Sequence, residues 1–473
     1  MHHRLAAGLL AASLVTAPLA AQDRVRAISA GDKQQGAAAN PQLVAQYGGR
    51  YTGPQATYVE RVGKRVAVQS GLSNAQGDFV VTTLNSSVEN AFAIPGGYIY
   101  VTRQLLALMN SEAELASVLG HEVGHVAARH SQGRQTRSTI GSILAAGAGL
   151  LTGSNVVGQL AGTGAQLYTL KYGRDQEYQA DALGVRYITA AGYNPYAAAD
   201  MLSALDASTG LASRASGKDA NAVPTWASTH PNSQDRVARA EKLAAATGRP
   251  EPAPAQDVAF LRMLDGLPYD DDPQQGIVDG QTFRHPGLRV RFTAPSGYRI
   301  ANGDDAVTVL GNGGQAQFQT IAAASAEAGV AARFRALGAS PSGEVRTGAT
   351  NGIPYATQTV RAAVNNQAVD ATVVAYKFPS AVYTFTLVTP AGSGVGPFAP
   401  LLDSVAPLTA AEANAIRGKV IRIHSVTAGD TIDRLAARMA YPDLKRERFL
   451  TLNGLGPDAP LRPGMLVKLV VSG

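Results

Sequence analysis

A short stretch with two histidines and a glutamate is the part of this sequence most able to do chemistry. His121 and His125 lie four residues apart in the stretch His-Glu-Val-Gly-His, so on a helix both imidazoles point from one face toward one metal ion. Glu122 lies one step around that helix, where its carboxylate can accept a proton from a water molecule that the metal activates. The pattern predicts a metal-dependent hydrolase with Glu122 as general base.

The surrounding residues predict the helix that this arrangement requires. Ser111 and Glu114 have the spacing of a capping box, in which each side chain bonds the backbone N–H of the other residue. Leu115, Val118 and Leu119 then follow at the spacing of an apolar helix face. We therefore expect the histidine pair to lie on a helix that begins at Ser111.

A third metal ligand is expected from a later helix. In the first segment Ala128 and Ser131 stand where a glycine and a third histidine would be needed, and we expect His130, one position early, to be solvated near the helix end. Glu177 lies in a later segment of helical spacing, with Asp181 one turn further on the same face. Both could belong to a solvated acidic face. After a histidine helix, we interpret Glu177 as the third ligand and Asp181 as an acceptor for a ligand's free ring N–H.

The histidine stretch is one of four motifs that occur between about residues 53 and 243. The others are Asn90–Gly97, Arg174–Asp181, and Ser228–Pro231 followed by Arg236. With these motifs the chain resembles the peptidase family of the CAAX prenyl protease and the heat-shock protease HtpX, and most of all its secreted, periplasmic branch. The resemblance implies a mainly α-helical gluzincin domain with a small β-sheet. It also implies one Zn²⁺ held by His121, His125 and Glu177, with a fourth position open to water.

The same resemblance implies a substrate-binding strand. Asn90, Ala91, Phe92 and Ala93 would form a strand beside the cleft, to which an extended peptide could add by backbone pairing. An ordinary edge strand is the alternative. The run Tyr98–Val101 that follows is rich in β-forming residues and is expected to be core.

Two further residues have open roles. His230 follows the polar stretch Gly210–Ala222, which is typical of a flexible lid. His230 would reach the zinc site, either to stabilise the oxyanion or to occupy the open position in a closed, resting form; the alternative is a turn before a helix at Asp235–Leu243. Arg236 would brace a carboxylate near the site or lie on the helix surface.

The N-terminus predicts export. A basic start, Met1–Arg4, precedes the apolar run Leu5–Ala20, and we expect cleavage after Ala21. The 473 residues contain no cysteine, which excludes a lipoprotein anchor and disulfides. We therefore predict a soluble periplasmic protein.

Composition limits the partners. The net charge of +6 is modest, and no basic run is interleaved with aromatic residues, so nucleic-acid binding is not expected. The uncharged segment Ser138–Leu170 is only mildly hydrophobic. We expect it to pack as small-residue helices beside the histidine helix, or to contact a membrane surface, rather than to span a membrane.

Three domains are predicted after the signal peptide (1–21). The metallopeptidase domain covers residues 22–248 and ends at a Pro-rich linker, 249–256. Residues 257–408 are expected to form a small α+β unit that binds substrate or acts as a spacer. Its pattern predicts one helix, 326–337, and strands at 288–292, 306–310, 317–321, 355–360, 369–376 and 382–388.

Residues 418–473 resemble a LysM domain, a βααβ unit that binds polymers of N-acetylglucosamine such as peptidoglycan. The matching residues are His424–Thr431, Leu452–Leu455 and Leu461–Met465, and Asp430 would cap the first helix. Asp433 and the charged stretch Tyr441–Arg448 depart from the usual pattern. The resemblance implies the fold, while glycan binding is one of two options beside a plain interaction domain.

These observations leave three functional interpretations. The first is an exported zinc metalloendopeptidase that hydrolyses unfolded or misassembled cell-envelope proteins. The second is an envelope chaperone or assembly factor whose protease site is gated by His230. The third is a peptidoglycan peptidase, suggested by the C-terminal domain, although the resemblance through Asn90–Gly97 favours protein substrates.

Overall fold

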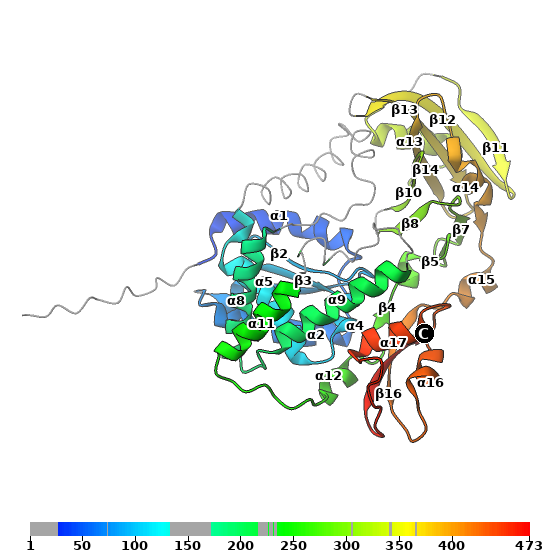
Figure 1. Cartoon of the computed structure of the whole chain (residues 1–473). Coiled ribbons are helices and arrows are strands. Elements are labelled where there is room, and N and C mark those ends of the chain that lie inside the picture. The colour runs from blue at the N-terminus through cyan, green and yellow to red at the C-terminus, as the bar shows by residue number, and fades with distance from the viewer. Residues whose placement is uncertain are drawn as a thin grey trace, which may run out of the picture.

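The computed structural model describes residues 27–72, 74–132, 172–215, 226, 230, 234–303, 306–339, 343–364 and 367–473. The predicted signal peptide and the uncharged segment Ser138–Leu170 lie outside the described residues. The chain is multidomain: a helical N-terminal part, a unit of antiparallel sheets, and a C-terminal strand–helix–helix–strand unit (Figure 1). Among the described residues, no helix combines the length and the apolar composition needed to cross a bilayer.

The N-terminal part packs helices around a three-stranded sheet. The strand order is β1-β3-β2, with β3 parallel to β1 and antiparallel to β2, so β2 is an edge strand. The elements are α1 (Ala30–Gln46), α2 (Pro54–Ala67), α3 (Ala75–Asp78), β1 (Val80–Leu84), β2 (Ala91–Ile94), β3 (Tyr98–Thr102), α4 (Arg103–Leu108), α5 (Glu112–Ala127), α8 (Arg174–Ala190), α9 (Ala197–Ala215) and α11 (Gln234–Ala246).

Helix α5 carries the histidine pair. Ser111 caps it as predicted, because Ser111 Oγ accepts the N–H of Glu114 at 3.1 Å. The second half of the predicted capping box is wrong. The Glu114 carboxylate accepts the N–H of Asn110 at 2.8 Å, since that N–H lies within its reach.

Glycines let α5 and α8 approach closely enough to share a site. A Cβ at Gly124 of α5 would lie 3.0 Å from the carbonyl oxygen of Ala180 in α8. A Cβ at Gly184 of α8 would lie 3.0 Å from the backbone nitrogen of His121. Because larger residues would push the two helices apart, these glycines set the distance between the histidines of α5 and the carboxylates of α8.

The middle unit is built from two antiparallel sheets. The larger has the strand order β11-β12-β13-β14-β10-β9-β8, and the smaller has the order β15-β7-β6-β5. Helix α13 (Ala326–Ala336) covers one face of the larger sheet with Val330 and Phe334. Its strands are β8 (Arg299–Asn302), β9 (Val307–Gly311), β10 (Gly314–Ile321), β11 (Arg346–Thr350), β12 (Ile353–Val364), β13 (Gln367–Lys377) and β14 (Val382–Pro390).

The smaller sheet faces the other side of this unit. Phe292 of β7 packs against Phe385 of β14, with ring centroids 5.1 Å apart. The strands are β5 (Ile277–Asp279), β6 (Thr282–His285), β7 (Val290–Thr293) and β15 (Ala406–Pro407). The short helix α14 (Ala399–Ser404) precedes β15, and the short helix α15 (Ala410–Ala415) follows it. Each predicted strand and the predicted helix overlaps an observed element, whereas the strands β5, β6, β8, β11 and β15 and the helix α14 were not predicted.

The C-terminal unit has the predicted order of elements: β16 (Lys419–Ser425), α16 (Ile432–Ala437), α17 (Lys445–Asn453) and β17 (Leu466–Ser472). Asp430 is not the helix cap, so that prediction is wrong. Thr431 Oγ1 accepts the N–H of Arg434 at 3.2 Å, whereas the Asp430 carboxylate accepts the N–H of Thr427 at 2.8 Å and lies 3.0 Å from the ring of His424. Asp430 therefore stabilises the turn before α16, and Thr431 caps the helix.

The C-terminal unit shares one hydrophobic core with the N-terminal part. Leu452 of α17 and Leu469 of β17 lie in the same buried cluster as Leu115 of α5. Helix α12 (Val258–Met263) adds Phe260 to it, and β4 (Pro268–Tyr269) extends the C-terminal sheet to the order β17-β16-β4. Residues 258–269, which were predicted to open the middle unit, therefore pack with the two ends of the chain. Figure 1 shows α17 beside α9 and α4.

Lys468 of β17 anchors the C-terminal unit on the N-terminal part. Its side chain is fully buried, and Nζ donates to the carbonyls of Ala107, Leu108 and Met109 at 2.8, 3.1 and 2.7 Å. These carbonyls end α4, where the helix dipole favours a cation. Burial lowers the pKa of Lys468 to about 7, and the charge of Glu114 opposes this. Three acceptors match the three N–H donors of an ammonium group, so we infer the charged form.

Candidate metal centre

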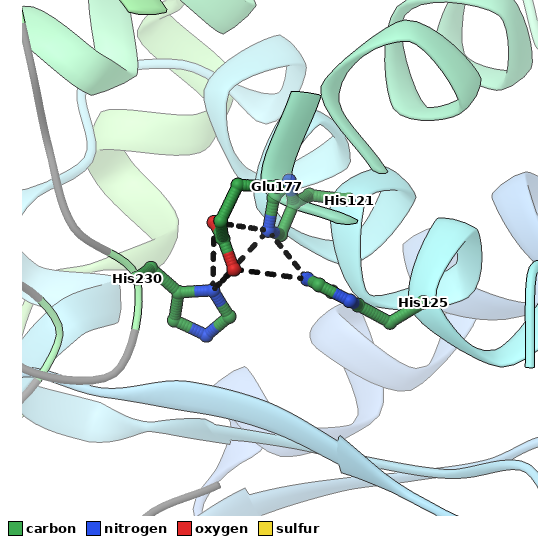
Figure 2. A group of neighbouring side chains, drawn as sticks. All are labelled: His121, His125, Glu177 and His230. Atoms are coloured by element: carbon green, nitrogen blue, oxygen red, sulfur yellow. Dashed lines mark hydrogen bonds and ion pairs between the residues drawn. The ribbon is translucent and has the colours of Figure 1, made fainter. Parts of the chain in front are cut away.

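Four side chains from three segments converge on one point (Figure 2). His121 and His125 project from α5, Glu177 from the first turn of α8, and His230 from a position before α11. His121 Nε2 lies 2.9 Å from His125 Nε2 and 3.3 Å from His230 Nδ1. His230 Nδ1 lies 3.0 Å from Glu177 Oε1. One potential ligand atom of each residue lies within 4.8 Å of the others, and all four residues are buried.

The geometry and chemistry of this cluster fit a zinc ion. Two nitrogen ligands at about 2.1 Å from a tetrahedral zinc lie roughly 3.4 Å apart. The contacts among the four side chains range from 2.9 Å, between the two histidines of α5, to 3.6 Å, between His125 Nε2 and Glu177 Oε1. Burial lowers the pKa of His125, as does the charge of His121, so that the imidazole of His125 stays in the neutral form that binds metals.

Glu122 lies beside the cluster, and its carboxylate forms no hydrogen bond with the described residues. Its side chain is fully buried, and neither oxygen has a hydrogen-bond partner among the described residues. Its Oε1 lies 3.6 Å from His230 Nε2, which also has no hydrogen-bond partner there. Burial raises the pKa of Glu122, which suits a proton acceptor. A buried carboxylate without partners points to a water molecule or a substrate group in this space.

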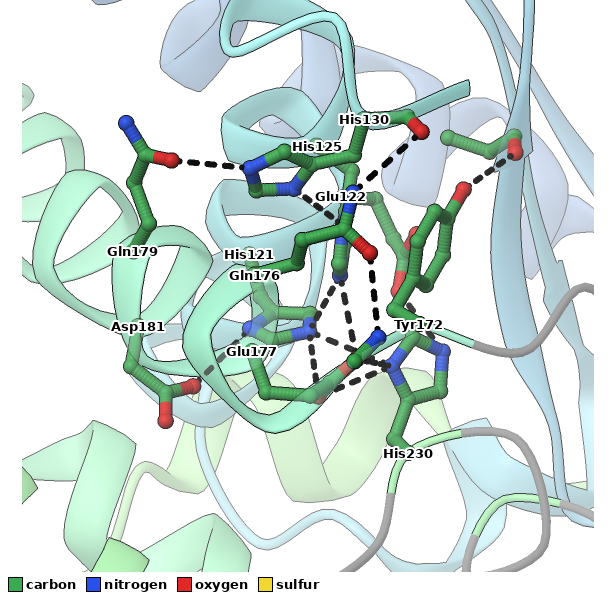
Figure 3. Close-up of polar contacts among 12 residues, drawn as sticks. His121, Glu122, His125, His130, Tyr172, Gln176, Glu177, Gln179, Asp181 and His230 are labelled. Carbon is green, nitrogen blue, oxygen red and sulfur yellow. Dashed lines mark hydrogen bonds and ion pairs between the residues drawn. The ribbon is translucent and has the colours of Figure 1, made fainter. Parts of the chain in front are cut away.

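Asp181 and Arg236 hold the ligands from behind. Asp181 Oδ1 lies 2.9 Å from His121 Nδ1, so it can accept that ring N–H and direct Nε2 into the cluster (Figure 3). Arg236, 1% exposed, donates to both oxygens of Asp181 and pairs with Glu177 at 3.0 Å. Burial raises the pKa of Asp181, but hydrogen bonds from His121 and Arg236 outweigh burial and lower it to about 2. Of the two options for Arg236, the structure shows the brace.

His130 belongs to this centre, so its predicted solvated position is wrong. It is 5% exposed, and its Nδ1 lies 2.8 Å from His125 Nδ1, while its Nε2 lies 3.0 Å from Gln179 Oε1. The chain leaves α5 through Arg129 at a φ of 58° and folds back, which brings His130 onto the rear of the His125 ring. Spacing on a continuous helix could not reveal this contact.

Two aromatic residues that sequence reasoning missed cover the centre. Tyr172 stacks on His125 with ring centroids 3.8 Å apart, and its hydroxyl donates to the carbonyl of Ala93 in β2 at 3.3 Å. Trp226 stacks on His230 at 4.2 Å, and its backbone N–H donates to the carbonyl of Glu89 at 3.1 Å. Trp226 is the single tryptophan of the chain, which is the one sequence signal that marks it.

The predicted substrate strand lies next to the centre as edge strand β2. Ala91 and Ala93 belong to the core cluster that includes α5, whereas Phe92 packs on the other side, against Tyr100 at 4.7 Å. Asn90 holds the start of the strand: its backbone N–H donates to a threonine of β3 and its side chain to Tyr47. The side chains toward α5 are small, and no described strand pairs with the outer edge of β2. Apart from the carbonyls of Ala93 and Glu89, which accept bonds from Tyr172 and Trp226, its backbone groups are therefore the means of binding a peptide.

Comparisons with known proteins agree with this geometry. Residues 54–244 match the model of Peptidase family M48, and this range contains every residue of the centre. Mitochondrial metalloendopeptidase OMA1 of Schizosaccharomyces pombe is 30% identical over 216 residues, 45% of this chain and 60% of that protein. The protein of the same name from Arabidopsis thaliana is 33% identical over 157 residues, 33% of this chain and 30% of that protein.

A bacterial relative is also similar over this region. Beta-barrel assembly-enhancing protease of Escherichia coli (strain K12) is 29% identical over 198 residues, 40% of this chain and 38% of that protein. The chain thus spans less than two thirds of the length of each of these relatives. Residues 54–244 are thus similar to Peptidase family M48 and to metalloendopeptidases, and the four residues that could hold a metal ion all lie in this range.

Proposed function

We propose that this chain is an exported zinc endopeptidase that cleaves unfolded or misassembled proteins of the cell envelope. The observation that carries the proposal is the convergence of His121, His125 and Glu177 next to the buried Glu122, whose carboxylate has no hydrogen-bond partner among the described residues. The edge strand β2 runs beside this centre, and an edge strand binds extended backbone rather than a folded domain. Unfolded chains offer such backbone.

The residues of the centre have separable roles. His121, His125 and Glu177 would hold the zinc ion, which when bound polarises a carbonyl and lowers the pKa of water. Glu122 accepts a proton from the attacking water and passes it to the leaving amine. Asp181 keeps Nε2 of His121 directed at the ligand position.

The envelope location and the client class are inferred from other parts of the chain. The basic and apolar N-terminus, the absence of cysteine and the LysM-like order of the C-terminal elements favour the periplasm and contact with peptidoglycan. Contact of Ser138–Leu170 with a membrane surface remains part of the proposal. The name of the E. coli relative, Beta-barrel assembly-enhancing protease, is in keeping with clients in the envelope.

Cleavage of casein, an unfolded protein, tests the proposed activity. The purified chain loaded with one equivalent of zinc should cut casein, lose the activity when a chelator removes the metal, and regain it when zinc is restored. Gel electrophoresis and zinc analysis measure the two quantities. Zinc-loaded protein that leaves casein intact, both alone and as the His230→Ala variant, would contradict an endopeptidase for unfolded proteins.

A gated form of the enzyme is the second candidate, because His230 occupies a ligand position. Its Nδ1 lies 3.0 Å from Glu177 Oε1 and 3.3 Å from His121 Nε2, so it stands where a fourth ligand would bind. Trp226 and Tyr172 donate hydrogen bonds to the carbonyls of Glu89 and Ala93, along the edge that a peptide would use. This arrangement supports a closed resting form, in which the chain could bind clients without cutting them.

Replacing His230 with alanine should therefore raise the rate of casein cleavage. If the closed form outweighs the open form by about ten to one, the expected increase is about tenfold. Initial rates at matched zinc content measure the effect, and His285→Ala, a histidine in the middle unit, should leave the rate unchanged. A lower rate for His230→Ala would instead assign His230 to stabilisation of the oxyanion.

A further inference from the structure

A cavity lies between the peptidase part and the C-terminal unit. Its volume is about 140 Å³. Leu108 of α4 and Leu211 of α9 line it on the peptidase side, and Tyr441 and Leu452 line it on the C-terminal side. Glu89, the residue that precedes Asn90 and the substrate strand, brings a carboxylate to it. The cavity therefore combines apolar walls with an acidic group.

Glu89 has no cationic partner among the described residues. Its two oxygens accept hydrogen bonds from Ser208 Oγ at 3.0 and 2.8 Å, and it forms no ion pair among the described residues. Burial raises the pKa of Glu89 to about 7; the bond from Ser208 lowers it and the charge of Asp270 raises it. A half-buried carboxylate with a raised pKa is stabilised in its charged form by an incoming cation.

The other charged groups of the cavity are already paired. Asp270 bonds Lys419 at 2.7 Å and the hydroxyl of Tyr441 at 2.8 Å. Arg448 lies over the Tyr441 ring at 4.1 Å and pairs with Asp443 at 3.2 Å. Glu89 is thus the charged group of the lining that has no ion pair among the described residues, so we expect the ligand of this cavity to be a cation. The Leu and Tyr walls suit the aliphatic stem of lysine or arginine.

The cavity lies at one end of the path that a bound peptide would take. Tyr172 links His125 to Ala93, near one end of β2. The Trp226 ring lies 5.9 Å from the His121 ring, and the backbone N–H of Trp226 donates to the backbone carbonyl of Glu89. The metal centre thus faces β2 between these two ends. A peptide paired antiparallel to β2 enters at Ala93 and leaves at Glu89, so Glu89 meets residues on the C-terminal side of the scissile bond.

We propose that this cavity is a substrate subsite for a lysine or arginine side chain on the C-terminal side of the cleaved bond. Glu89 pairs with the cation, and Leu108, Leu211 and Leu452 contact the stem. The C-terminal unit then acts as one wall of the substrate site, held in place by Lys468. This inference rests on the proposed peptidase function.

Blocked peptides that carry lysine or its neutral isostere norleucine at successive positions test the subsite. At one position after the scissile bond, lysine should raise kcat/KM about tenfold over norleucine, the scale of a hydrogen bond to a charged group. Glu89→Gln keeps the size of the side chain and the contact with Ser208 and should abolish this ratio. Glu60→Gln, exposed on α2, should retain it. Equal rates for lysine and norleucine peptides in the native chain overturn the subsite, as does a ratio unchanged in Glu89→Gln.

A binding measurement separates failure of the subsite from failure of the proposed function. The zinc-loaded Glu122→Gln variant should bind the lysine peptide about tenfold more tightly than the norleucine peptide in calorimetry, and added Glu89→Gln should remove the difference. If the native chain cuts no peptide but this preference holds, the subsite stands and the peptidase function fails. If cleavage occurs and neither rate nor affinity favours lysine, the subsite is wrong and the peptidase function stands.

Discussion

Replacing Glu122 with glutamine is expected to lower kcat/KM for casein by a factor between about 10² and 10⁴, because the amide cannot accept the proton of the attacking water. Glu122 is buried beside the ligand cluster, and no described residue forms a hydrogen bond to either oxygen, so glutamine fits the same space. The ligands His121, His125 and Glu177 are unchanged, and zinc content should stay at one per chain. Initial rates and zinc analysis on the same samples measure both effects.

The control for this experiment is Glu60→Gln, the same chemical change on the exposed face of α2. Its rate and zinc content should equal those of the native chain. If Glu122→Gln cuts casein as fast as the native chain, then Glu122 is not the general base and the activity has another origin. If Glu122→Gln loses zinc, the glutamate would have a structural role in the metal centre that its position beside the cluster does not predict.

Replacing Lys468 with methionine is expected to lower the free energy of unfolding by about 3 kcal/mol, because three buried carbonyls lose their donor. Methionine retains most of the aliphatic stem, so the packing of β17 should change little. The affected carbonyls, from Ala107 to Met109, lie directly before the cap of the histidine helix. Urea-induced unfolding measures the change.

Lys242→Met, on the exposed surface of α11, is the matched control and should change the free energy of unfolding by less than about 0.5 kcal/mol. A loss below about 1 kcal/mol for Lys468→Met would mean that the C-terminal unit is only loosely attached. The C-terminal unit would then not hold its wall of the Glu89 cavity in a fixed position. In that case the cavity would not give the preference for lysine proposed above.

Local patterns in the sequence were enough to place the chemistry on its elements. The spacing of His121 and His125, the cap at Ser111 and the apolar positions of the same helix are all properties of one helix, and α5 forms where they predict it. The strands predicted for the middle unit follow from short-range periodicity, whereas the strand–helix–helix–strand order of the C-terminus was expected from its resemblance to a LysM domain. Glu177 could be predicted as a ligand from the sequence because it lies on a second helix of regular spacing.

Contacts between distant segments were decided only by the tertiary structure. His130 was assigned to solvent because a straight helix turns it away, yet the backbone reversal at Arg129 places it against His125. Tyr172 and Trp226 cover the centre from segments with no metal-binding pattern, so no local motif assigns them to it.

The C-terminal unit shows the same division most clearly. Its internal order could be predicted from the sequence, but not its attachment. The buried ammonium of Lys468 reaches carbonyls about 360 residues earlier in the chain, and a core cluster joins the two parts. Sequence periodicity reports which face of an element is apolar. Which other apolar face covers it depends on the whole packed chain, because burial is non-directional and only close packing selects the partner.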